Sequence, residues 1–157
     1  MEKREDYLKK AIFLAADNVR ENGGGPFGAL IVRDGEVLGS GVNSVTIDND
    51  PTAHAEINAI RNACHKLGTF NLKGCTLYAS CEPCPMCLSA AYWARVDGII
   101  FAADKTNARD AGFDDAFIYE EIALPFSDRT IRTEQIAVKE SNMPFEIWKE
   151  SDNKILY

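Results

Sequence analysis

Three cysteines lie within the seven residues CEPCPMC, Cys81–Cys87, although the whole chain has only five. Two overlapping Cys-x-x-Cys pairs are possible there, Cys81 with Cys84 and Cys84 with Cys87. An odd and clustered set of cysteines, behind an N-terminus without an apolar signal core, does not fit a disulfide framework. The missing signal core and the cysteine pattern both predict a cytoplasmic protein. In that reducing compartment, such a cluster more often binds a metal or performs redox chemistry.

Length and charge limit the class of protein further. A chain of 157 residues with 46% apolar and 26% charged residues fits one soluble domain, residues 1–157. No apolar run approaches the ~20 residues of a membrane span. The net charge of −7 argues against nucleic acid, which is bound mainly through Lys and Arg. A small neutral substrate is the easier match.

The hydrophobic pattern predicts an α/β domain. Asp34-Gly35 between two apolar runs predicts a β-hairpin. Helical spacing appears at residues 7–19 and again from about residues 52–54 to a cap at Gly68. A strand at residues 75–79, a helix at 85–94 and a doubly buried strand at 98–103 make a βαβ unit with parallel strands. Short helices at 108–122, a strand at 134–138 and a helix near 144–150 complete a mixed sheet with helices on both faces.

A missing metal ligand is expected at another helix start facing the same end of the sheet. The segment PTAHAEINAI supplies His54 and, two residues later, Glu56. Residues two apart on a helix point to opposite sides, so they share a site only off the helix end. Cys84 and Cys87 also lie at a predicted helix start, where the positive end of the helix favours thiolates.

This set of residues is typical of a hydrolytic zinc centre. Zn²⁺ accepts thiolates and a neutral imidazole, and three protein ligands leave a fourth position open for water. Two thiolates make the centre formally neutral, so that water there can ionise near neutral pH. A neighbouring carboxylate, Glu56, can take the proton and deliver it to a leaving group.

Taken together, HAE and PCPMC match the known signature H-x-E…P-C-x-x-C, and the chain resembles the zinc-dependent cytidine deaminase-like superfamily. The resemblance assigns one Zn²⁺ per subunit to His54, Cys84 and Cys87, with Glu56 as proton shuttle. Cys81 lies outside the pattern and reads as a small buried residue. The resemblance also implies a three-layer α/β/α fold with a five-stranded mixed sheet.

Within that superfamily the chain is most similar to small bacterial guanine deaminases, on the evidence of AGFDDAFIYEEI and PFEIWKESDNKILY beside the shared motifs. This resemblance implies hydrolysis of guanine to xanthine and ammonia. It also implies a homodimer in which the C-terminal segment, about residues 140–157, is exchanged between subunits as a lid over the active site. The implied purine contacts are polar groups, apolar walls and a lid residue: Asn43, the backbone N–H of Ala55, Asp115, Phe27, Trp93 and Tyr157. The resemblance also implies that Asp115 assists proton transfer.

Several alternatives stay open at this point. Asp115 or Asp114 can cap a helix, Phe27 and Trp93 can be core residues, and Asn43 can simply end a strand. Guanosine, cytosine and tRNA adenosine are alternative substrates, although the charge of −7 and a closed lid disfavour tRNA. A non-catalytic zinc module would need a fourth protein ligand, such as Cys81.

Overall fold

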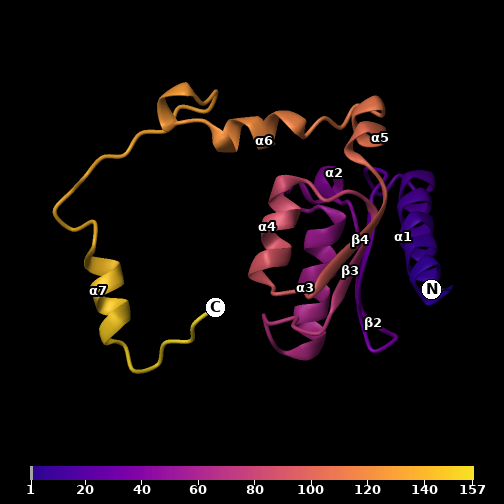
Figure 1. Ribbon diagram of the computed structural model, residues 1–157, viewed down its shortest axis with the longest axis horizontal. Helices are drawn as coiled ribbons and strands as arrows, with labels where there is room; N and C mark the ends of the chain where they lie inside the picture. The colour runs from indigo at the N-terminus through magenta and orange to yellow at the C-terminus, as the bar shows by residue number, and fades with distance from the viewer. Residues whose placement is uncertain (1) are drawn as a thin grey trace. The chain divides into compact units, whose positions relative to one another are not determined.

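The computed structural model describes residues 2–157, which divide into two compact units, the first ending at Ala116 and the second beginning at Phe117. Figure 1 shows the chain as a ribbon. No helix among these residues is long and apolar enough to cross a membrane. In the first unit the elements are α1 (Glu2–Arg20), β1 (Gly28–Arg33), β2 (Glu36–Val42), α2 (Val45–Asp48), α3 (Ala55–Leu67), β3 (Thr76–Cys81), α4 (Pro85–Trp93), β4 (Gly98–Ala103) and α5 (Lys105–Asp110).

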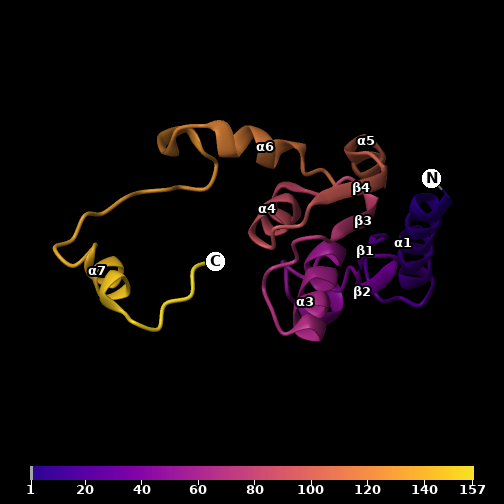
Figure 2. The ribbon, with the colours of Figure 1, turned by 60° about the horizontal axis from the view of Figure 1, so that its bottom comes forward.

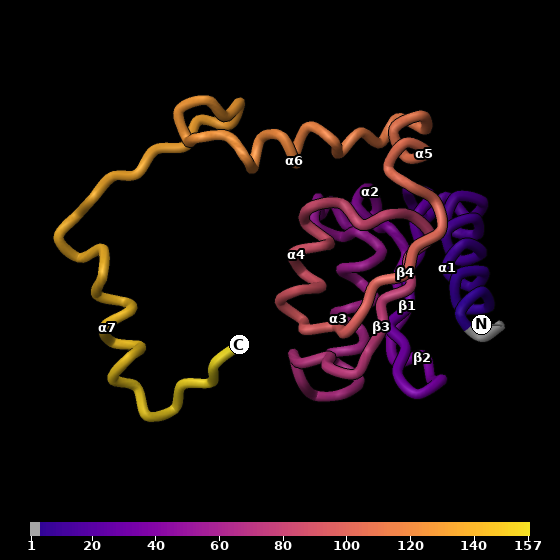
Figure 3. Tube along the Cα trace, in the orientation of Figure 1, coloured from indigo at the N-terminus to yellow at the C-terminus, as the bar shows by residue number. Residues whose placement is uncertain are grey.

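A mixed sheet with strand order β2-β1-β3-β4 forms the centre of this unit. Strand β1 pairs antiparallel with β2 and β3, and β3 pairs parallel with β4. The predicted hairpin is confirmed, because Arg33 pairs with Glu36 and both Asp34 and Gly35 have positive φ, as a tight two-residue turn requires. The predicted parallel βαβ unit is also confirmed by the pairing of β3 with β4. Figure 3 shows the two strands as neighbours along the Cα trace.

Helices cover both faces of the sheet, so the three-layer arrangement is confirmed (Figure 2). Alternation along β1 explains how: Ala29 and Ile31 pack with α3 and α4, whereas Leu30 and Val32 pack with α1. Helix α3 lies close against β2, because a Cβ added at Gly41 would come within 2.3 Å of the Ala55 carbonyl oxygen. Glycine at this position therefore allows the short distance between β2 and α3, the helix that carries the predicted glutamate and begins directly after the predicted histidine.

Two predictions about the sheet are wrong. The sheet has four strands instead of five, because residues 134–138 form no strand in the described part of the chain. The apolar alternation there has no neighbouring strand to pair with, and an isolated strand is not stable. Strand β4 is an edge strand and is only half-buried, with Phe101 43% exposed, although its apolar run predicted burial on both faces.

The second unit, Phe117–Tyr157, contains most of α6 (Ala116–Ala123), the 3₁₀ helix η1 (Phe126–Asp128) and α7 (Met143–Glu150). The turn after α6 is held by Glu121, whose carboxylate accepts from both the N–H and the hydroxyl of Thr130 at 2.8 Å. Arg129 donates to the carbonyls of Ile122 and Leu124 at 3.2 and 3.1 Å. Helix α7 confirms the predicted C-terminal helix.

Candidate metal centre

The two predicted ligand motifs both fall at helix starts, as expected. His54 is the N-cap residue of α3 and Cys84 is the N-cap residue of α4, with Pro85 in the first turn. Neither side chain makes the hydrogen bond that an N-cap residue normally makes to its own helix. Both side chains are thereby available to a group beyond the helix ends.

His54, Cys84 and Cys87 come together in space. His54 Nδ1 lies 3.5 Å from the Sγ of Cys84 and 3.5 Å from the Sγ of Cys87. The three ligand atoms all lie within 4.8 Å of one another. Among residues 2–157, no other group of three His, Cys, Asp or Glu side chains is arranged to hold a metal ion.

These distances fit a tetrahedral Zn²⁺ site. With Zn–S of about 2.3 Å and Zn–N of about 2.05 Å, the N-to-S edge of a tetrahedron measures about 3.6 Å. The observed separations of 3.5 Å therefore leave room for the cation with little movement of the side chains. Two sulfurs and one imidazole nitrogen are also the donor types that zinc prefers.

The ionisation of the three side chains is coupled. A hydrogen bond from Cys87, helped by His54, lowers the pKa of the Cys84 thiol to about 4, against the cost of burial. The same contact with Cys84 raises the pKa of the Cys87 thiol, and contact with Cys84 also raises the pKa of the His54 imidazole. Cys84 is thus the most readily ionised of the three side chains, and a bound cation would displace any proton that the ligand atoms still carry.

Glu56 lies in the first turn of α3, two residues after His54, and only 7% of it is exposed. Burial raises the pKa of its carboxyl, with a further contribution from the negative charge of Cys84. A raised pKa brings a carboxyl closer to the pH at which it can both accept and release a proton. The position and ionisation of Glu56 therefore suit a proton shuttle beside the metal.

Cys81 is the third cysteine of the opening cluster and is not one of the three converging ligands. It lies at the end of β3, and its thiol contacts the Asp104 carbonyl oxygen at 3.4 Å. Burial raises the pKa of this thiol to about 11, so it remains protonated at neutral pH. The prediction that Cys81 is a small buried residue is confirmed.

Asn43 follows β2 directly and is 7% exposed. Its side-chain oxygen accepts from the backbone N–H of Gly25 at 3.2 Å and of Val45 at 3.4 Å. Sequence reasoning missed Asn18 on α1, whose carboxamide nitrogen donates to the carbonyls of Gly25 at 2.9 Å and Asn43 at 2.8 Å. No motif marks Asn18, because its partners lie in loops that only the fold brings to α1.

The remaining predicted residues lie in different places. Ala55 is the first residue of α3, so its N–H has no acceptor within the helix. Phe27 is half-buried and meets Phe113 edge to face, with ring centroids 5.0 Å apart. Asp115 is half-buried, and burial, followed by the charge of Cys84, raises the pKa of its carboxyl.

Asp114 precedes α6, and its carboxylate accepts from the N–H of Ala116, the first residue of that helix, at 3.0 Å. Trp93 is the last residue of α4 and is 65% exposed. It lies about 9 Å along the helix axis from Cys87. Tyr157 belongs to the second unit.

Comparison with known proteins gives consistent matches. Residues 1–103 match the family described as the cytidine and deoxycytidylate deaminase zinc-binding region. Guanine deaminase of Bacillus subtilis (strain 168) is 52% identical over 153 residues, which is 98% of each chain. A tRNA-specific adenosine deaminase of Aquifex aeolicus (strain VF5) is 43% identical over 104 residues, 66% of this chain and 69% of that one. The X-ray structure of the Bacillus subtilis guanine deaminase superposes with a TM-score of 0.96 over 98% of both chains.

Proposed function

This chain belongs to the cytidine and deoxycytidylate deaminase zinc-binding family, and from that premise we propose that it hydrolyses guanine to xanthine and ammonia. One observation carries the choice of guanine: the similarity to a guanine deaminase extends over 98% of the chain, beyond the matched zinc-binding region. The tRNA-specific relative matches only 66% of the chain. The similarity to the guanine deaminase therefore includes the residues after β4.

His54, Cys84 and Cys87 would hold the Zn²⁺ ion, because their donor atoms have the types and separations that zinc requires. When bound, the ion supplies a Lewis acid that makes water a better nucleophile near neutral pH. Three protein ligands leave one position open, as catalytic zinc sites do.

Glu56 moves the protons in the proposed reaction. Its carboxylate takes a proton from the attacking water as the water oxygen bonds to C2 of guanine. Glu56 passes that proton to N3. It then takes the proton of the new C2 hydroxyl and delivers it to the amino nitrogen, so that the C2=O bond forms as the C2–N bond breaks. The products are xanthine and ammonia, so one water is consumed for each guanine. A buried carboxyl with a raised pKa suits this alternation between base and acid.

Asn43 would present a donor to the purine. The oxygen of its carboxamide already accepts from two backbone N–H groups, which cannot themselves act as acceptors. The NH₂ group is therefore the part left to contact a substrate, and it suits an acceptor such as O6, N7 or N3. The Ala55 N–H at the start of α3 adds a second donor with the same preference.

Asp115 would accept from the N–H groups of guanine and would assist proton transfer. Burial raises the pKa of Asp115, and the negative charge of Cys84 raises it further. Cys84 in turn has the largest effect in raising the pKa of His54, and the charge of Asp115 adds a smaller increase. This mutual influence supports a place for Asp115 beside the metal ligands. Phe27, held edge to face by Phe113, would form an apolar wall for the flat ring.

The proposed assembly is a homodimer in which residues 140–157 are exchanged, so that Tyr157 closes the active site of the second subunit. Phe117–Tyr157 is a compact unit of its own, as an exchanged segment would be. Its helix α7 has exposed apolar side chains, among them Phe145 and Ile147, which a partner subunit would cover. Trp93, exposed at the end of α4, would be covered in the same way and would form the second apolar wall in the dimer.

Mixed dimers test the exchange with full-length chains. We expect Tyr157→Ala and Glu56→Gln each to lower activity on its own. If segments are exchanged, a mixed dimer of the two variants regains activity, because one site has an intact Glu56 and receives an intact Tyr157. Refolding Glu56→Gln with the double variant Glu56→Gln/Tyr157→Ala gives the inactive control. No recovery in verified mixed dimers would contradict the exchange.

A substrate panel tests the reaction itself. Ammonia release is measured from guanine, guanosine, cytosine and a tRNA anticodon stem containing adenosine, with the zinc-loaded protein. We expect guanine to give the highest kcat/KM. A preference for any other member of the panel would replace guanine by that substrate, and zinc-loaded protein inactive on all four would contradict the proposed function.

A further inference from the structure

The loop between β2 and α3 connects two residues of the proposed active site. Asn43 lies at the beginning of this loop and His54 lies at its end. A backbone bond from Ser44 N–H to the Ala53 carbonyl, 3.0 Å long, closes the loop on itself. Substrate recognition and metal binding therefore share one closed turn of chain.

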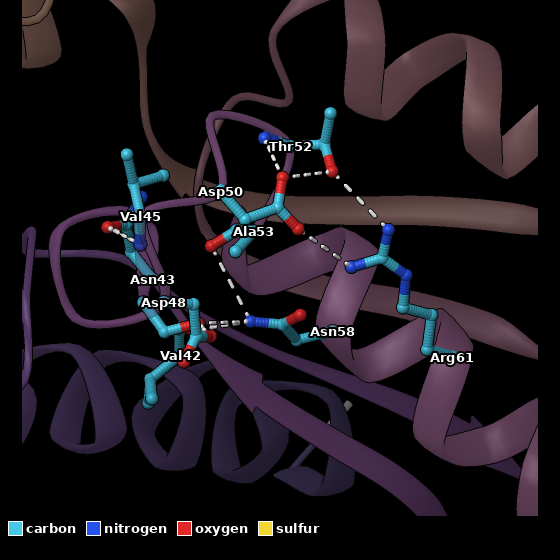
Figure 4. Close-up of polar contacts among 10 residues, drawn as sticks. Val42, Asn43, Val45, Asp48, Asp50, Thr52, Ala53, Asn58 and Arg61 are labelled. Atoms are coloured by element: carbon cyan, nitrogen blue, oxygen red, sulfur yellow. Dashed lines mark hydrogen bonds and ion pairs between the residues drawn. The ribbon is translucent and has the colours of Figure 1, made fainter.

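One side chain reaches both ends of that loop. Asn58, one turn into α3, directs its carboxamide nitrogen toward three oxygens (Figure 4). The distances are 2.9 Å to the Val42 carbonyl, 3.1 Å to the Ser44 hydroxyl and 3.5 Å to the Ala53 carbonyl. An NH₂ group has two hydrogens, so the two shorter contacts are its main bonds. Val42 and Ser44 are the residues on either side of Asn43.

The bond to Ser44 links Asn58 to the side chain of Asn43. Ser44 donates its hydroxyl hydrogen to Asp48 at 2.5 Å, so its oxygen is left to accept from Asn58. The next residue, Val45, gives the N–H that holds the Asn43 side-chain oxygen at 3.4 Å. Displacing Ser44 moves this N–H and turns the Asn43 carboxamide.

The polar contacts among Asp50, Thr52 and Arg61 lie outside this connection. Asp50 accepts from the N–H and the hydroxyl of Thr52 at 2.8 and 2.7 Å, and Arg61 pairs with Asp50 at 3.7 Å (Figure 4). These groups are exposed, and exposed ion pairs contribute little to holding a structure. None of them contacts Asn43 or its two neighbours in sequence.

We infer that Asn58 is a positioning residue that fixes the Asn43 carboxamide for substrate binding. The inference rests on the proposed function, in which Asn43 contacts the purine. Asparagine suits this position because all three neighbouring oxygens act as acceptors toward it. An aspartate there would place a negative charge against the same three oxygens and would donate nothing.

Asn58→Asp is the test variant, and Asn62→Asp is its matched control. Asn62 lies one turn later on α3 and donates to the Ser40 carbonyl of β2 at 2.8 Å, so it makes the same kind of bond away from Asn43. With stoichiometric zinc in all proteins, we expect Asn58→Asp to raise KM for guanine about tenfold and to lower kcat by less than about threefold. Asn62→Asp should stay within about twofold of wild type.

A double-mutant cycle shows whether Asn58 acts through Asn43. In an Asn43→Ala background, where the carboxamide is absent, Asn58→Asp should raise KM by less than about twofold. Asn58→Ala, which removes the donor without adding charge, should show a smaller change in the same direction. Equal effects with and without the Asn43 side chain, or an equal effect of Asn62→Asp, would overturn the inference.

A readout without substrate separates this inference from the proposed function. The side-chain NH₂ resonance of Asn43 in a ¹H–¹⁵N spectrum should shift in Asn58→Asp and not in Asn62→Asp. No shift would overturn the positioning role, whatever the protein does with guanine. A shift without a change in KM would retain the positioning of Asn43 and would contradict its proposed contact with guanine.

Discussion

The carboxamide nitrogen of Asn18 donates to the backbone carbonyl of Asn43 at 2.8 Å, across 25 residues of sequence. The same nitrogen donates to the Gly25 carbonyl at 2.9 Å, so both of its hydrogens are used. Asn18 is 7% exposed. Helix α1 thereby ties the glycine-rich loop to the loop that begins with the proposed substrate contact.

Asn18→Asp should destabilise the protein. An aspartate there loses both donors and places a buried carboxylate against two carbonyl oxygens, which costs about 1–3 kcal/mol or more. Denaturant unfolding with fitted midpoints and slopes measures the change. Asn71→Asp is the matched control, because the Asn71 side-chain oxygen only accepts from Lys73 N–H and an aspartate keeps that bond. Equal stability of the two variants would refute the assignment.

Glu56→Gln should lower kcat for guanine by about 10²–10⁴-fold, because the glutamine amide cannot carry a proton between water and the leaving amine. Zinc content and the far-ultraviolet circular dichroism spectrum should match wild type, since the metal ligands are untouched. Single-turnover ammonia release with purified protein is the measurement. Activity near the wild-type level in a variant free of reversion would exclude Glu56 as the shuttle.

The same substitution should stabilise the zinc-free protein, and by more at higher pH. Burial raises the pKa of Glu56, so the folded state holds its proton more tightly than the unfolded state. Wild-type stability therefore falls as pH rises from the usual range of a glutamate through the raised pKa. The glutamine side chain does not ionise, so the variant does not lose this part of its stability as pH rises. The difference in Tm between variant and wild type should be larger at about pH 8 than at about pH 5, and a constant difference would show that charge burial is not its cause.

Zinc binding should depend on Cys87 and not on Cys81. Cys87 lies 3.5 Å from His54 Nδ1, whereas Cys81 is directed to the Asp104 carbonyl and has a pKa raised to about 11 by burial. We expect Cys87→Ser to lose stoichiometric zinc and Cys81→Ser to retain it, as measured by atomic emission after gel filtration. Zinc loss in Cys81→Ser alone would reassign the ligands within the cluster.

Gly41→Ala should destabilise the protein and lower its zinc content. The new Cβ would lie 2.3 Å from the Ala55 carbonyl oxygen and 2.5 Å from the Ala59 nitrogen, so the backbone of α3 must move. Such overpacking costs about 1–3 kcal/mol. Gly98→Ala in β4 is the control, because its nearest neighbour is an atom of Thr76 at 3.9 Å. Unfolding and zinc content are measured for both, and identical behaviour would contradict the tight fit of α3.

Local patterns predicted most of the first unit correctly. The Asp34-Gly35 turn, the helix that begins after His54 and the parallel strands around α4 each depend on residues close together in sequence. The failures involve long-range pairing. The segment 134–138 alternates as a strand does, yet the pattern cannot tell whether a partner strand is present. The apolar run of β4 likewise predicts burial without showing that the strand lies at an edge.

The three metal ligands were predictable because a catalytic zinc centre restricts both residue type and spacing. Asn18 and Asn58 were not, since asparagine is common at surfaces and each donates to a backbone carbonyl distant in sequence, 25 residues away for Asn18 and 16 for Asn58. The role of Trp93 came only from the family resemblance and stays a prediction, because this residue at the end of α4 is proposed to form its wall in the dimer.

The N-cap positions of α3 and α4 carry residues that suit a metal ion better than they suit the start of a helix. Histidine and cysteine at positions 54 and 84 make no capping bond, whereas Ser, Thr, Asp or Asn at such positions typically contributes ~1 kcal/mol. A descendant of this protein released from the need for metal would gain stability by acquiring those residues. Substitution of positions 54 and 84 by good capping residues would therefore mark lineages that keep the fold and have lost the metal-dependent activity.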